Sequence, residues 1–202
     1  MQQLTKRMTR HRPIGTNYVL VHSDMRQLPV PNQLFSYADA YSTASVVLCQ
    51  KMMGDTSSCT WPNGAVVLML AAHAVELFLK GVLLKRNPAM DVWSHGHSID
   101  SLSKEYKSQF PGHSFTWDIP FASPSPVGEW MEVMQGMNPD LTVDEIKRLR
   151  PATPPDPSIL YRYPVGKDGQ EWRGLFGFEP HSFLLLLSQV RSDFERIKSQ
   201  LA

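Results

Sequence analysis

Apolar residues recur at helical spacing along much of the chain, and the longest such stretch lies between residues 63 and 86. Its sequence, NGAVVLMLAAHAVELFLKGVLLKR, is dominated by Val, Leu, Ala, Met and Phe. Pro62 suits the first turn of a helix, where its missing N–H needs no partner. Asn87 precedes a proline, and such a residue avoids helical backbone angles. We therefore predict a central helix that ends before residue 87.

Other segments show apolar positions three and four residues apart, or the residues that typically begin and end helices. Ser98 is a suitable N-cap, and Thr142-Val-Asp-Glu145 has the spacing of a capping box. The further helices expected on these grounds span residues 32–53, 99–110, 142–149 and 180–201, with a short one within 127–136. The first two helices, joined by a short loop, should form an antiparallel hairpin.

The remaining segments are expected to be non-helical. Residues 1–31 form an extended, basic N-terminal arm with one possible strand near residues 18–22, and residues 113–126 form a loop packed on the surface. The proline-rich sequence of residues 151–157 is typical of a stiff spacer. Residues 161–165 and 171–178 flank a Gly-containing turn, a pattern that predicts a small β-hairpin before the last helix.

The whole pattern predicts a mainly α fold, in which residues 32–202 form one helical bundle with an insertion at about 111–179. The final helix carries a narrow apolar seam, with residues alternately four and three apart. The seam members are Phe183, Leu187, Val190, Phe194, Ile197 and Leu201. Such a seam packs either in the core or in a dimer interface.

Charge and cysteine content indicate which partners and which cellular environment to expect. The 20 basic and 19 acidic residues nearly balance, so no overall field indicates a nucleic-acid or membrane partner. Residues 1–12 are locally basic, which fits either phosphate contact or a solvated chain end. We expect a soluble, cytoplasmic protein, since the N-terminal region lacks the apolar core of a signal peptide and the central helix is interrupted by polar residues. Cys49 and Cys59 fit reduced thiols, and we expect neither a cofactor nor a metal.

Two charged residues lie in the middle of the apolar central helix. Glu76 and Lys80 are four residues apart with the acid first, so they share a face and can pair. His73 lies on the same side of the helix. The group either binds a ligand or orients His97 from the next loop; the simpler alternative is an intrahelical ion pair.

Two more candidates lie outside the helices. His95 and His97 form a His-x-His sequence, which is compatible with a metal pair or an acid–base group but is a weak pattern, since no third ligand follows at a fixed spacing. A structural role for His97, as a hydrogen-bond partner of Glu76 or a helix cap, is the alternative. Arg162, between two tyrosines, either clamps a phosphate with Tyr163 available for base stacking, or pairs with an acid such as Glu76.

Several motifs also resemble those of HEPN-domain proteins. The matching segments are Ala71-Ala-His-Ala-Val-Glu-Leu-Phe-Leu-Lys80, Leu83-Leu84, Gly96-His97-Ser98-Ile99 with Leu102, and Tyr161-Arg-Tyr-Pro164. Together they place the resemblance over residues 33–110 and, more weakly, 158–200. Ser98 stands where the family more commonly has Asp.

The resemblance implies a small helical bundle that binds a nucleotide or RNA, or senses a partner protein, in a prokaryotic defence or toxin–antitoxin type of system. It also implies a homodimer with a polar site at the cleft. The residues that match the family pattern or lie beside it are Glu76, Lys80, His97, Arg162 and Tyr163, which we expect to form one ligand-binding cluster.

The chain departs from HEPN ribonucleases at their catalytic motif, an Arg followed after four to six residues by His. Here Arg173 and His181 are separated by seven residues, just before the final helix. A non-catalytic module is therefore the leading hypothesis. A divergent, metal-independent ribonuclease that uses Arg173 and His181 is the first alternative, and a structural dimerisation protein is the second.

Overall fold

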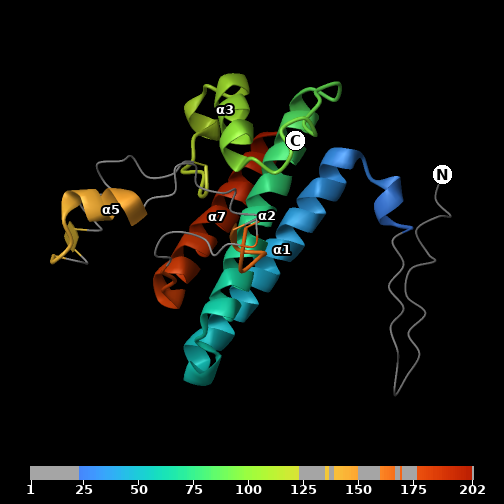
Figure 1. The fold of residues 1–202 in the computed structure, drawn as a ribbon. Coiled ribbons are helices and arrows are strands. Elements are labelled where there is room, and N and C mark those ends of the chain that lie inside the picture. The colour runs from blue at the N-terminus through green and yellow to red at the C-terminus, as the bar shows by residue number, and fades with distance from the viewer. Residues whose placement is uncertain are drawn as a thin grey trace, which may run out of the picture.

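The computed structural model describes residues 23–122, 135–136, 139–149, 160–166, 169 and 177–201, and this part of the chain is mainly helical (Figure 1). Its α-helices are α1 (Val30–Gly54), α2 (Trp61–Arg86), α3 (Ile99–Gln109), α5 (Val143–Leu149) and α7 (Pro180–Gln200). Three short 3-10 helices are η1 (Met25–Gln27), η2 (Thr56–Ser58) and η3 (His113–Phe115). The prediction of a mainly α fold is confirmed.

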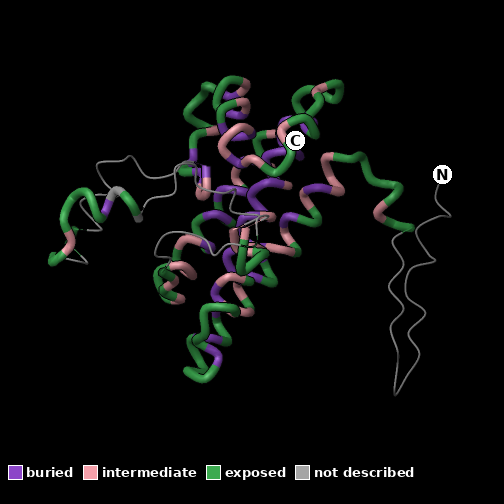
Figure 2. The backbone as a smooth tube through the Cα atoms, viewed as in Figure 1, coloured by how far each residue is buried: buried purple, intermediate pink, exposed green. Residues whose placement is uncertain are grey.

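Helices α1 and α2 form the long antiparallel hairpin that the sequence predicts (Figure 1). Helix α7 runs antiparallel to α1 and packs against both members of the hairpin. Helix α3 covers the C-terminal half of α2, and α5 lies to the side of the bundle. Buried residues line the sides of the helices that face one another (Figure 2).

Stacked aromatic rings fill the centre of the bundle. The ring of Phe78 on α2 stacks on that of Phe194 on α7, with centroids 3.8 Å apart and an interplanar angle of 6°. Trp117 presents its ring edge-on to both, at 6.0 and 5.7 Å. Phe35 of α1 completes the group, 5.6 Å from Phe78. Because aromatic side chains bury large areas, this group ties three helices and one loop into a single core.

The final helix uses its apolar seam within the chain. Leu187, Val190, Phe194 and Ile197 are all buried. Core packing, one of the two uses that the sequence allowed for the seam, therefore accounts for these four positions.

Helix α1 begins at Val30, two residues earlier than predicted. Pro31 falls in its first turn, where a missing N–H costs nothing. Residues 25–27 form η1, so the described end of the N-terminal arm is not extended. The predicted strand at residues 18–22 lies outside the described residues.

The segment after η3 differs from the prediction of a surface loop. Trp117, Ile119 and Ala122 are buried in the core. Arg196 of α7 holds the preceding turn by donating hydrogen bonds to the backbone carbonyls of Ser114 and Thr116. An aperiodic segment gives no signal of burial in the sequence, because the rings that enclose Trp117 belong to other elements, α2, α3 and α7.

Capping predictions are confirmed where the structure describes them. Thr142 accepts from the backbone N–H of Glu145 at 3.3 Å, and Glu145 accepts from that of Thr142 at 2.8 Å, which is the predicted capping box. Ser98 caps α3 by accepting from Ser101 N–H at 3.3 Å. The spacer at residues 151–157 and most of the helix at 127–136 lie outside the described residues.

The β-hairpin also remains a prediction. Residues 167–168 and 170–176 lie outside the described residues, and the described part of the chain contains no strand. Within it, Tyr161 and Arg162 occupy a turn.

By length and composition, Trp61–Arg86 qualifies as a candidate membrane span, although we expected its polar residues to exclude this. In the structure 72% of the apolar window is buried inside the bundle. A mostly buried core helix passes the same test of length and composition.

Candidate functional site

The polar centre of α2 is built around Glu76, a residue that is only 1% exposed. Lys80, one turn later and 4% exposed, donates to Glu76 Oε1 at 2.8 Å. A buried carboxylate and a buried ammonium each cost several kcal/mol unless they are paired and hydrogen-bonded. The predicted ion pair is therefore confirmed, and its burial shows that the two side chains depend on each other.

The loop between α2 and α3 supplies the next contact. Asp91 accepts from the backbone N–H groups of Trp93 and Ser94, both at 3.2 Å, which tightens the loop into a turn. Gly96 has a φ of 57°, a left-handed conformation that glycine adopts without strain. Its carbonyl oxygen thereby reaches Lys80 Nζ at 2.6 Å. Lys80 thus ties the loop to the helix.

Two histidines are the remaining hydrogen-bond partners of Glu76. His97 Nδ1 lies 3.1 Å from Oε1 and 3.2 Å from Oε2, and His73 Nδ1 lies 3.4 Å from Oε2. The expected hydrogen bond between His97 and Glu76 is therefore confirmed. We call the group Glu76, Lys80, His73 and His97 the carboxylate cluster.

Electrostatics keep Glu76 ionised. Burial opposes the charge, but hydrogen bonds from His73, Lys80 and His97 and the charge of Lys80 outweigh it and lower the pKa of Glu76 from 4.5 to about 2. An ionised carboxylate only accepts hydrogen bonds, so His97 Nδ1 carries the proton. The other ring nitrogen of His97, Nε2, has no hydrogen-bond partner among the described residues, and the side chain is 53% exposed.

Trp93 links the carboxylate cluster to the surface. Lys80 Nζ lies 5.3 Å from the centroid of the Trp93 ring, a cation–π distance. Trp93 is nevertheless 56% exposed and lines a groove of about 510 Å³. The other lining residues are apolar except for one lysine: Pro29, Val30, Pro31, Leu84, Lys85, Pro88 and Met90. We call this the Trp93 groove.

The structure brings together three of the five predicted ligand-binding residues, Glu76, Lys80 and His97. Arg162 and Tyr163 are exposed, and Arg162 is not among the hydrogen-bond or ion-pair partners of Glu76. The neighbouring Tyr161 packs instead near Phe121, with ring centroids 6.4 Å apart. The expected part of Arg162 and Tyr163 in the same site therefore stays a prediction.

The proximity of the ribonuclease candidates Arg173 and His181 stays a prediction. Arg173 lies outside the described residues. His181 is exposed in the first turn of α7, where its backbone N–H donates to Glu179 Oε1 at 3.0 Å.

The two histidines of the His-x-His sequence contact different residues. His95 Nδ1 lies 2.7 Å from Ser101 Oγ, whereas His97 turns to Glu76. In the described part of the chain, no group of three or more His, Cys, Asp and Glu side chains is arranged to hold a metal ion. Cys49 is a buried free thiol and Cys59 an exposed one.

Sequence analysis missed the Trp93 groove. The signal that the sequence offered was Trp93, an aromatic residue in the loop that carries His97. The groove itself depends on how the start of α1 packs against the end of α2, which local sequence does not reveal.

Comparisons of the chain with protein-family models, with curated proteins and with solved structures found no match.

Proposed function

We propose that this chain is a non-catalytic helical module that binds a nucleotide or RNA at Trp93 and His97. The observation that carries the proposal is that Lys80 is bonded within the protein, whereas Trp93 and His97 nearby are exposed. Its ammonium group is buried and occupied by Glu76 and by the Gly96 carbonyl. Glu76 and Lys80 therefore hold the loop, and the exposed side chains of that loop meet the ligand.

Trp93 supplies a surface for a nucleobase. Its exposed ring borders the apolar Trp93 groove, and stacking of a base on an aromatic ring is worth ~1–3 kcal/mol. Lys85 lines the same groove and offers an ammonium group to a phosphate. An aromatic platform beside a basic side chain is the combination used for single-stranded nucleic acids and nucleotides.

His97 supplies a polar contact of defined orientation. Because Nδ1–H is directed to Glu76, Nε2 of this half-exposed side chain is left as a hydrogen-bond acceptor for a ligand.

An RNA-binding titration tests the proposal. Fluorescence anisotropy with a labelled single-stranded RNA would be compared between the wild type, Trp93→Ala and His97→Gln. We expect Trp93→Ala to weaken binding by roughly 10- to 100-fold, from the loss of ~1–3 kcal/mol of stacking. Trp61→Ala, which removes another exposed tryptophan at the opposite end of α2, is the matched control. Equal affinities for the two tryptophan variants would refute the site.

A second candidate, a metal-independent ribonuclease, is favoured by the His97 tautomer. A carboxylate-bound imidazole with its second nitrogen free is a suitable general base for a 2′-hydroxyl. Gel analysis of RNA incubated with wild type, His97→Gln and His181→Ala separates the possibilities. Cleavage lost only in His97→Gln would make the protein an enzyme centred on His97. Cleavage lost only in His181→Ala would restore the Arg173–His181 assignment.

The resemblance to HEPN proteins supports two further parts of the proposal, homodimerisation and a role in a prokaryotic defence or toxin–antitoxin type of system with a partner protein. The alternative, a purely structural dimerisation module, would bind no RNA. Native mass spectrometry of the purified protein distinguishes these cases, because it reports both the oligomeric state and any nucleotide mass carried with it.

A further inference from the structure

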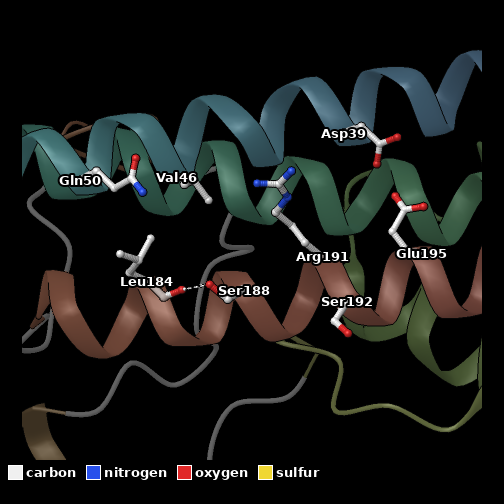
Figure 3. A pocket seen from close by; sticks show the side chains of 8 residues that line it. All are labelled: Asp39, Val46, Gln50, Leu184, Ser188, Arg191, Ser192 and Glu195. Carbon is white, nitrogen blue, oxygen red and sulfur yellow. Dashed lines mark hydrogen bonds between the residues drawn. The ribbon is translucent and has the colours of Figure 1, made fainter.

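A second groove lies between α1 and α7 (Figure 3), and none of its lining residues belongs to the carboxylate cluster. Its volume of about 620 Å³ falls within the usual range for small-molecule sites. The lining residues come from these two helices alone: Asp39, Val46, Gln50, Leu184, Ser188, Arg191, Ser192 and Glu195. We call it the Arg191 groove.

Arg191 lies at the middle of this groove and points from α7 towards α1 (Figure 3). Its guanidinium group forms no hydrogen bond or ion pair with any described residue, although two carboxylates line the same groove. Those carboxylates are engaged elsewhere: Lys198 Nζ lies 3.0 Å from Asp39 Oδ2 and 2.6 Å from Glu195 Oε1. Arg191 therefore offers its planar set of N–H donors, which matches a carboxylate in bidentate geometry.

One end of the Arg191 groove is negative. Asp39 and Glu195 share the single ammonium group of Lys198, so one negative charge is left over there. Glu195 Oε2 has no partner among the described residues. This end suits a ligand's ammonium group.

The other end is partly apolar. Val46 and Leu184 are half-buried and face each other across the groove (Figure 3). The Gln50 side chain lies beside them, and Ser188 Oγ donates to the carbonyl of Leu184 at 2.9 Å. An aliphatic group placed between Val46 and Leu184 would leave water.

From this order of groups we infer that the Arg191 groove binds a free amino acid with an apolar side chain. The carboxylate of the ligand pairs with Arg191, its ammonium group with Glu195 and Asp39, and its side chain packs on Val46 and Leu184. The site is independent of the Trp93 groove, so it stands or falls separately from the proposed function.

Isothermal titration with three related probes tests the inference. L-Leucine carries all three groups, 4-methylpentanoate lacks the ammonium group, and 3-methylbutylamine lacks the carboxylate. We expect leucine to bind with a Kd of about 1 mM or below, which a ligand of this size can reach. The carboxylate should bind more weakly, and the amine should show no binding.

Variants assign the contacts. Arg191→Gln should weaken leucine binding by roughly 10- to 100-fold, the usual worth of charge-assisted hydrogen bonds. Glu195→Gln should weaken leucine but leave 4-methylpentanoate unchanged. Arg86→Gln, an exposed arginine on α2, is the control and should bind leucine as the wild type does.

The inference fails if leucine does not bind the wild type, or if Arg191→Gln binds it equally well. It also fails if Arg191→Gln abolishes a dimer while leucine has no effect, because the groove is then an interface between two copies. Circular dichroism of each variant confirms that it is folded, as expected for an exposed side chain without partners.

Discussion

At the scale of single residues, burial decides what the charged side chains do. The Glu76–Lys80 pair is enclosed by α2 and the loop before α3, with the Glu76 and Lys80 side chains 2% and 5% exposed. Lys104 and Asp100 form a pair of the same spacing on α3, but there the two side chains are 76% and 40% exposed. The two ion pairs have the same spacing, but the surrounding protein buries one of them and leaves the other in solvent.

We expect Lys80→Met to lower the free energy of unfolding by about 3 kcal/mol, because it leaves the buried Glu76 charge without its main partner. Lys104→Met breaks the exposed pair and should cost less than ~1 kcal/mol. Urea denaturation of both variants measures the difference. Similar losses in the two variants would contradict a structural role for Lys80.

At the scale of elements, α1 packs tightly against α2 at a glycine, Gly81. A Cβ atom on Gly81 would lie 2.6 Å from Cε1 of Phe35 and 3.3 Å from the carbonyl oxygen of Pro31. One neighbour is backbone and the other is a ring packed against Phe78. Neither is the end of a flexible side chain, so the absence of a side chain at Gly81 sets the distance between the two helices.

Gly81→Ala should therefore destabilise the protein by about 1–3 kcal/mol, although alanine is intrinsically the better helix former by ~1 kcal/mol. Gly54→Ala is the matched control, since a Cβ atom there meets nothing within 4 Å. It should leave the midpoint of thermal unfolding unchanged or raise it. If Gly81→Ala also raised the midpoint, the close packing of α1 on α2 would be wrong.

At the scale of the whole molecule, the pKa of Glu76 links stability to pH. Its value of about 2 in the folded protein lies below the reference of 4.5, so at intermediate pH the unfolded chain binds more protons. The stabilisation from Glu76 is complete above about pH 5 and is lost as the pH falls towards 2. This pKa difference between the unfolded and the folded protein corresponds to about 3 kcal/mol in the free energy of unfolding.

Denaturation of the wild type between pH 2 and 7 should show this loss, and Glu76→Gln should show a shallower dependence over the same interval. Glu179 also has a lowered pKa, about 2, from its hydrogen bonds to Ser182 and His181 at the start of α7. Its contribution is common to both proteins and cancels in the difference. Parallel curves for wild type and Glu76→Gln would show that Glu76 is not held as described.

Local signals in the sequence were sufficient for the helices and for part of the site. The start and end of α2, the capping box at Thr142 and the pairing of Glu76 with Lys80 all depend on residues within four positions of one another. The bond from His97 to Glu76 was also anticipated, because a polar group inside so apolar a helix needs partners.

Long-range packing decided the rest. Trp117 enters the core because Phe78 and Phe194 leave a place for it, and no pattern around Trp117 records those two residues. Likewise, the seam of α7 closes onto the core, and Glu76 bonds to His73, Lys80 and His97 rather than to Arg162. The sequence by itself determined a helical protein with a paired carboxylate in its central helix. Only the tertiary structure decided that Lys80 is enclosed while Trp93 and His97 face solvent, because exposure depends on how distant segments cover one another.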